Sequence, residues 1–254
     1  MPLAHEVTGP AGTPALLLGG SLGTTRTMWR PQVTALSQRM RVVVFDHRGH
    51  GRSPAPPGPY DIADLGNDVV DLLDHLNLDR VHYAGLSLGG MVGMWLAARH
   101  AERVDRLALL CTAAYLPPAG AWLSRAAQVR AHGTASLTDT LLGRWFTAGY
   151  ADRHPDTVAR LVTDLAASPA EGYAACCEAI AAMDLRPLLP EIASPTLVVA
   201  GADDPATPPR EAQLITEAVP EARLAVLDRA AHLASVEQPA RVTALLAEHF
   251  LEER

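Results

Sequence analysis

The chain has 254 residues, of which 48% are hydrophobic and 19% are charged, a balance that suits one globular domain or a core with an insertion. Its net charge of −7 and the lack of any run of Lys and Arg argue against nucleic acid or an anionic membrane surface as a partner. The three cysteines (Cys111, Cys176 and Cys177) have neither the number nor the spacing of a disulfide framework or a zinc site. We therefore expect no metal ion and interpret all three as buried apolar residues.

The first residues lack a basic region followed by an apolar run, which argues against a secretory signal. No apolar stretch approaches the roughly 18 residues that a membrane span needs. These patterns predict a cytoplasmic protein in a reducing compartment.

Apolar, β-branched runs alternate with amphipathic segments at both ends of the chain. Strands are predicted at residues 15–18, 41–45, 80–84, 106–111, 195–200 and 223–227, with one short edge strand near residues 5–7. Helices are predicted at residues 28–39, 62–76, 91–100, 211–219 and 238–251. Strands that alternate with helices at this spacing predict an α/β fold, with a mostly parallel sheet and helices on both faces.

The alternation stops between residues 112 and 186, where only helical periodicity is visible. Helical segments are predicted there at residues 119–132, 136–148, 156–165 and 170–182. We therefore expect a core formed by residues 1–111 and 187–254, and a helical cap formed by residues 112–186. Packing is the first explanation of the apolar stripes in the cap, and a lid over a pocket is the further hypothesis.

A Gly-x-Ser-x-Gly sequence stands between a predicted strand and a predicted helix, with Gly85, Ser87 and Gly89 in the fixed places. A sharp turn from strand to helix exposes the side chain at its apex, and the glycines avoid collisions with the neighbouring backbone. The pattern alone also suits an ordinary glycine-rich turn. The strand before it and the helix after it favour Ser87 as a nucleophile.

Three polar side chains follow three predicted strands: Ser87, Asp204 and His232. The carboxyl ends of parallel strands meet at one edge of a sheet, so these side chains are expected to lie together. A serine hydroxyl needs a base to act as a nucleophile, a histidine can supply that base, and a carboxylate can orient the histidine. Asp203 is the alternative carboxylate, but the spacing from Gly201 favours Asp204.

The negative oxygen that forms during acyl transfer needs preorganised N–H donors. The amide of Leu88, at the start of the predicted helix, is one candidate. By position, the amide of Leu22 in the loop after the first long strand is the other, and Gly20 and Ser21 leave its backbone accessible.

Taken together, these residues resemble the α/β-hydrolase family over nearly the whole chain and, within it, the 3-oxoadipate enol-lactonases. The narrower signals are the Ser-Leu-Gly-Thr run at 21–24, the Arg-Trp-Phe-Thr run at 144–147 and the run at 231–239. The resemblance implies that 3-oxoadipate enol-lactone is hydrolysed to 3-oxoadipate in the β-ketoadipate pathway of aromatic catabolism. Ser87 would form an acyl-enzyme, with no metal and no organic cofactor.

The implied substrate is a small anionic lactone, so its pocket must satisfy one carboxylate. The predicted cap offers Arg125 and Arg144 beside Trp122 and Trp145. Arginine can bind both carboxylate oxygens, and tryptophan can cover a small ring. We predict Arg144 as the carboxylate ligand and Arg125 as the second choice; the alternative is that the arginines lie on the surface and the tryptophans pack the cap.

Two other readings stay open. One is another cofactor-free hydrolase on this fold, such as a carboxylesterase, a carbon–carbon bond hydrolase or a perhydrolase-type enzyme. The other is a non-catalytic binding protein that reuses the fold. Turnover of a chromogenic short ester would separate the binding protein from all of the enzymes.

Overall fold

The computed structural model describes residues 3–251, and a seven-stranded sheet lies at its centre. The strands are β1 (His5–Thr8), β2 (Ala15–Gly19), β3 (Arg41–Phe45), β4 (Val81–Leu86), β5 (Val104–Leu110), β6 (Thr196–Gly201) and β7 (Ala222–Leu227). Their order in the sheet is β1-β3-β2-β4-β5-β6-β7. Only β1 runs antiparallel to its neighbour, which confirms the predicted α/β fold with a mostly parallel sheet.

The position of each strand explains its composition. Every residue of β2 and β4 is buried, because both strands lie in the middle of the sheet and have helices on each side. The two edge strands, β1 and β7, contain most of the exposed strand residues. Continuous apolar runs mark the buried strands β2 and β6, whereas β4 also buries the polar residue His82.

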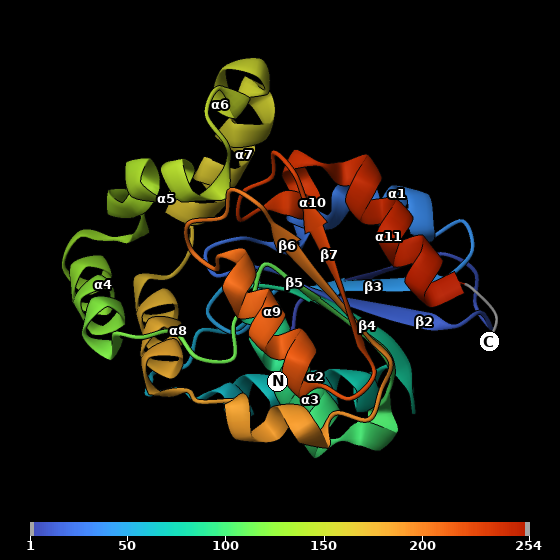
Figure 1. Ribbon diagram of the computed structural model, residues 1–254. Helices are drawn as coiled ribbons and strands as arrows, with labels where there is room; N and C mark the ends of the chain where they lie inside the picture. Colours follow the sequence, from blue (N-terminus) through green and yellow to red (C-terminus); the bar gives the residue numbers. More distant parts are fainter. Residues whose placement is uncertain (1–2, 252–254) are drawn as a thin grey trace.

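Helices cover both faces of the sheet (Figure 1). On one face lie α1 (Arg30–Leu36) and α11 (Pro239–Leu251). On the other face lie α2 (Ile62–His75), α3 (Leu88–Arg99) and α9 (Pro209–Ala218). The shorter helical turns are η1 (Arg26–Trp29), η2 (Ala101–Arg103), η4 (Arg186–Glu191) and α10 (Ala234–Glu237).

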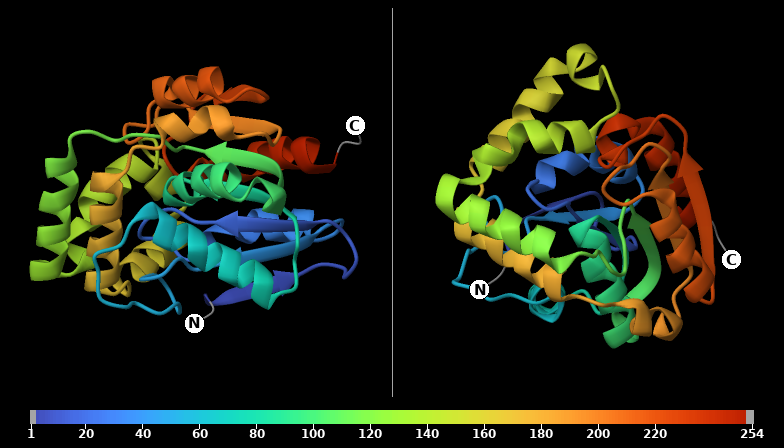
Figure 2. Two further views of the ribbon diagram at one scale, coloured as in Figure 1. Left: turned by 90° about the horizontal axis from the view of Figure 1, so that it is seen from below. Right: turned by 60° about the vertical axis from the view of Figure 1, so that its left-hand side comes forward.

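The helices between residues 112 and 186 stand together at one end of the sheet (Figure 2). They are α4 (Ala119–His132), η3 (Thr134–Leu137), α5 (Thr138–Trp145), α6 (Tyr150–Arg153), α7 (Pro155–Ala166) and α8 (Ala170–Ala182). We call this group the cap. Helices α4 and α8 lie side by side in both views of Figure 2, and Arg130 of α4 forms ion pairs with Glu171 and Glu178 of α8.

Three predicted helices differ from the structure by three residues or more at one end, and the others agree to within two residues. The segment predicted at 28–39 is divided into η1 and α1 and ends at Leu36, and the one predicted at 91–100 already begins at Leu88. The segment predicted at 136–148 ends at Trp145, because Phe146 adopts an extended conformation. The carbonyl groups of Arg144 and Trp145 are then free to accept hydrogen bonds from a distant loop. Within residues 3–251, no helix has the length and apolar character that crossing a membrane requires.

Candidate active site

Ser87 occupies a strained turn between β4 and α3. Its φ angle is +55° and its ψ angle is −112°, a backbone conformation that residues other than glycine rarely adopt. The turn is possible only because its neighbours are small: a Cβ atom on Gly85 would lie 2.1 Å from the carbonyl oxygen of Gly89, and one on Gly89 would lie 2.3 Å from that of Gly19. The backbone thus holds the Ser87 side chain at the carboxyl end of the sheet.

The loops after β6 and β7 bring Asp204 and His232 into contact. Asp204 Oδ2 lies 2.9 Å from His232 Nδ1, and the Asp204 side chain is fully buried. Burial by itself would raise the pKa of Asp204, but the interaction with His232 and the hydrogen bonds from Thr207 outweigh it and lower the pKa. Since an ionised carboxylate only accepts hydrogen bonds, Nδ1 of His232 carries a proton and Nε2 faces away from Asp204.

Asp203, the alternative carboxylate, lies elsewhere. It is exposed and lines an open surface cleft of about 880 Å³ that contains neither Ser87 nor His232. The sequence did not indicate Thr207, whose hydroxyl donates to Asp204 Oδ2 (2.7 Å) and lies 3.3 Å from His232 Nδ1. Of the two aspartates, only Asp204 has the geometry of a partner for the imidazole.

A much smaller cavity, of about 50 Å³, brings together the residues predicted for the site. Ser87, His232 and Leu22 line it from the core. From the cap come the four predicted substrate-binding residues, Trp122, Arg125, Arg144 and Trp145, together with Leu116, Leu141 and Tyr173. Because this cavity holds Ser87 and His232, we take it rather than the larger surface cleft as the candidate active site. Among the described residues, the Ser87 hydroxyl makes no hydrogen bond to His232, a geometry that often tightens only when substrate binds.

The four substrate-binding candidates differ in exposure. Trp145 is buried, Trp122 and Arg125 are half-buried, and Arg144 is exposed at the edge of the cavity. The guanidinium of Arg125 lies 4.7 Å from the centre of a Trp122 ring, a cation–π contact. Partial burial at the cavity edge lowers the pKa of Arg144, and repulsion by Arg125 lowers it further. Within residues 3–251, neither arginine is paired with a carboxylate.

The loop that contains Leu22 is fixed from several sides. Its carbonyl at Gly20 accepts hydrogen bonds from the amide of Gly89 (3.0 Å) and from His47 Nε2 (3.2 Å), and the amide of Gly23 donates to His50 Nε2 (2.9 Å). Burial lowers the pKa of both imidazoles, that of His47 to about 3, so His47 is neutral near pH 7. His50 is neutral because its Nε2 accepts the hydrogen bond from Gly23. The amide of Leu22 itself donates to no other group among the described residues, and neither does that of Leu88.

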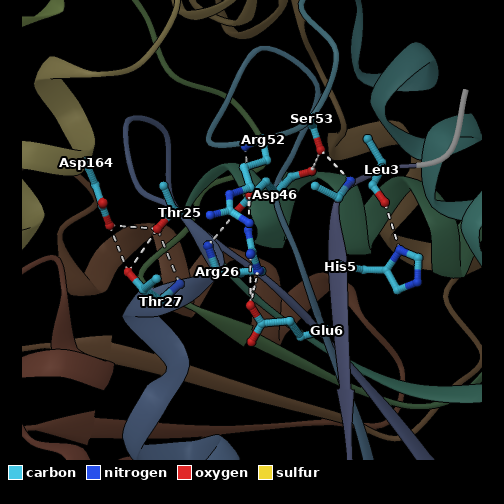
Figure 3. Close-up of polar contacts among 11 residues, drawn as sticks. Leu3, His5, Glu6, Thr25, Arg26, Thr27, Asp46, Arg52, Ser53 and Asp164 are labelled. Carbon is cyan, nitrogen blue, oxygen red and sulfur yellow. Dashed lines mark hydrogen bonds and ion pairs between the residues drawn. The ribbon is translucent and has the colours of Figure 1, made fainter.

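The end of the same loop is tied to both the core and the cap (Figure 3). Buried Asp46 accepts hydrogen bonds from the amides of Arg26 (2.7 Å) and Arg52 (3.0 Å). The hydroxyls of Thr25 and Thr27 both donate to Asp164 Oδ2 on α7, at 2.7 and 2.8 Å. The loop is thus held between β3 and the cap.

The loop of His232 is also tied to the cap. The amide of His232 donates to the carbonyl of Arg144 (3.3 Å), and the amide of Leu233 donates to that of Trp145 (2.9 Å). Glu237 accepts from the amides of Thr147 (2.9 Å) and Ala231 (2.7 Å). The imidazole and the predicted substrate-binding residues on α5 therefore have fixed relative positions.

No metal-binding arrangement exists in the described part of the chain: nowhere within residues 3–251 do three or more His, Cys, Asp or Glu side chains come together in a way that could hold an ion. All three cysteines are buried and free, and burial raises the pKa of each thiol. Protonated thiols of this kind are poor ligands and poor nucleophiles.

Comparisons with known proteins identify the family of the chain. The family described as "alpha/beta hydrolase fold" matches residues 14–239. The 3-oxoadipate enol-lactonase 2 of Acinetobacter baylyi is 43% identical over 93% of this chain and 88% of its own length. The crystal structure of the enol-lactonase from Burkholderia xenovorans LB400 superposes with a TM-score of 0.96 at 41% identity, and the match covers 98% of this chain and 96% of that one.

Relatives whose names propose a different reaction, carbamate hydrolysis, also match; RutD of Variovorax paradoxus is 35% identical over 94% of this chain and 92% of its own length. The matches confirm the resemblance to α/β-hydrolases and to enol-lactonases that the motifs indicated. The chain therefore belongs to the alpha/beta hydrolase fold family, and it is an enzyme of the hydrolase class.

Proposed function

We propose that Ser87, His232 and Asp204 form the catalytic triad of a serine hydrolase, with Ser87 as nucleophile and His232 as general base. The strained conformation of Ser87 supports its role, because strain of this kind is kept where the surrounding structure enforces it for function. The hydrogen bond between His232 Nδ1 and buried Asp204 supports the roles of these two residues, because it leaves His232 Nε2 free to take the serine proton.

The amides of Leu22 and Leu88 are proposed as the donors to the negative oxygen of the tetrahedral intermediate. Leu88 is the first residue of α3, where an amide has no partner within the helix. Leu22 lines the cavity beside Ser87, and its neighbours Gly20 and Gly23 are both held by hydrogen bonds. Donors that are fixed in advance stabilise this charge without reorganisation during the reaction.

As substrate we propose 3-oxoadipate enol-lactone, a small lactone that carries one carboxylate. The similarity to enol-lactonases supports this choice. So do Arg125 and Arg144, which line the cavity and have no acidic partner within residues 3–251. Arg144 is the first candidate for the carboxylate and Arg125 the second, while Trp122 and Trp145 would cover the ring.

The reaction follows from these roles. Ser87 Oγ attacks the lactone carbonyl carbon while His232 Nε2 takes its proton. The bond to the ring oxygen breaks, His232 returns the proton, and the resulting enol tautomerises to a ketone. His232 then activates one water molecule, which cleaves the ester to Ser87 and releases 3-oxoadipate. The net change is the addition of one water, and His232 carries every proton that is transferred.

The observation that carries this proposal is that Ser87, the His232–Asp204 pair and two unpaired arginines share one small cavity. The test is an assay of the purified protein on the enol-lactone, on a neutral short ester and on a simple carbamate. We expect a kcat/KM for the lactone of about 10⁴ M⁻¹ s⁻¹ or more, well above the value for the neutral ester.

Carbamate hydrolysis is the second candidate, favoured by the 35% identity to RutD. An uncharged carbamate would leave Arg125 and Arg144 without a carboxylate partner in the substrate complex, so we place it second. A kcat/KM for the carbamate above that for the lactone would reverse this order.

A further inference from the structure

Tyr173 on α8 is a buried residue whose hydroxyl has no acceptor for its proton. The residue is 0% exposed and lines the same cavity as Ser87 and His232. Among residues 3–251, no group accepts the phenol proton, and the side chain that interacts with the phenol oxygen is Arg125, which can only donate. A buried hydroxyl without a partner destabilises a folded protein, so such a group in a functional cavity requires an explanation.

Packing fixes the ring of Tyr173 at the cavity wall. A Cβ atom on Gly23 would lie 3.0 Å from ring carbon Cε2, and the His50 ring centre lies 6.3 Å from that of Tyr173. The tyrosine therefore joins α8 to the loop of Leu22 and cannot turn away without opening that contact.

Two positively charged groups, the guanidinium groups of Arg125 and Arg144, share the cavity wall with Tyr173. Burial raises the pKa of the Tyr173 phenol, and Arg125 opposes the rise. An ionised Tyr173 would oppose the lowering of the Arg144 pKa, and Arg144 lines the same cavity. A guanidinium can only donate hydrogen bonds, so neither arginine can accept the phenol proton. This wall of the cavity therefore offers three hydrogen-bond donors: the Tyr173 hydroxyl and the guanidinium groups of Arg125 and Arg144.

We propose that Tyr173 is a specificity-determining residue whose hydroxyl donates to the substrate carboxylate, in one subsite with Arg125 and Arg144. The inference rests on the proposed function, because the enol-lactone is the carboxylate-bearing substrate proposed above. An ionised carboxylate accepts from all three groups, takes the unpaired phenol proton, and offsets the repulsion between the arginines. A neutral ester has no carboxylate to accept these hydrogen bonds or to offset the repulsion between the arginines.

The first test measures substrate preference. Tyr173→Phe removes the hydroxyl and keeps the ring against Gly23, so the ratio of kcat/KM for the anionic lactone to that for a neutral ester should fall about 10-fold, mainly through KM. Tyr150→Phe is the matched control, because the Tyr150 hydroxyl donates to the carbonyl of Val236 and lies outside this cavity. The control should leave the ratio unchanged. An unchanged ratio in Tyr173→Phe overturns the inference.

The second test measures binding without turnover. Ser87→Ala protein is titrated calorimetrically with adipate, a stable dicarboxylate, and with its neutral dimethyl ester. We expect adipate to bind and the double variant Ser87→Ala/Tyr173→Phe to bind it about 10-fold more weakly. Equal affinities, or no adipate binding by Ser87→Ala, overturn the inference.

The two proposals fail in different ways. If the wild-type protein does not hydrolyse the enol-lactone but adipate binding still depends on Tyr173, the carboxylate subsite stands and the proposed substrate is wrong. If the lactone is hydrolysed and neither test responds to Tyr173→Phe, the function stands and the subsite is wrong. Circular dichroism spectra that match the wild type confirm that each variant is folded.

Discussion

Two adjacent aspartates differ completely in their surroundings. Asp204 is buried against His232 Nδ1, whereas Asp203 is exposed in a cleft without Ser87. Asp204→Asn should lower kcat about 10⁴-fold, because an amide favours the wrong tautomer of the imidazole. Asp203→Asn should change kcat by less than about two-fold. Steady-state kinetics on one ester substrate decide the matter, and the reverse ranking would show that the loop after β6 has been misinterpreted.

Buried His47 makes stability depend on pH. Its pKa in the folded protein is about 3, against an ordinary value of 6.5, so between these values the unfolded chain binds more protons than the folded one. The free energy of unfolding should therefore fall as the pH drops below 6.5. His47→Gln keeps an N–H donor for the carbonyl of Gly20 without a titrating group.

Urea unfolding at pH 7 and pH 5 tests this. The loss of unfolding free energy between these two pH values should be about 2 kcal/mol smaller in His47→Gln than in the wild type. His50 and His249 keep contributing in the variant, because burial lowers the pKa of both. Identical pH dependence of the two proteins would mean that the His47 imidazole becomes protonated without cost.

At the scale of elements, Glu237 at the end of α10 joins the cap to the loop of His232. Its carboxylate accepts from the amides of Thr147 and Ala231, and from the Thr147 hydroxyl. Glu237→Gln replaces one acceptor oxygen by a donor, so at least one of these bonds is lost. We expect an unfolding free energy lower by about 1–3 kcal/mol and a kcat about 10-fold lower, because the imidazole is displaced.

Glu248→Gln is the control for this prediction. Glu248 forms a half-exposed surface ion pair with Arg223, and such pairs contribute little. Denaturant unfolding and kcat should both stay near the wild-type values in this variant. If Glu237→Gln behaves in the same way, the link between cap and core does not position His232.

For the whole molecule, the fold was predictable because its central strands are buried on both faces. Burial of that kind favours continuous apolar runs, which stand out in β2 and β6. The positions of Ser87, Asp204 and His232 followed from the same logic, since each lies in the turn or loop that follows a strand. The strands, and the residues that follow them, could therefore be predicted from the local pattern of the sequence.

Features that depend on contacts between distant segments could not be predicted. Helix α5 ends at Trp145, where the carbonyls of Arg144 and Trp145 meet amides of a loop almost 90 residues away. Tyr173 looks like any apolar residue of a buried helix until α8 packs against Gly23. Such features arise from tertiary packing, which a single sequence does not record.

The central claim is that this cavity hydrolyses a lactone through Ser87. The most direct test compares kcat/KM of the wild-type protein and of Ser87→Ala on 3-oxoadipate enol-lactone. We predict efficient turnover by the wild type and a loss of about 10⁴-fold or more in folded Ser87→Ala protein. Near wild-type turnover by Ser87→Ala would contradict the serine mechanism, and the absence of turnover by the wild type would contradict the proposed substrate.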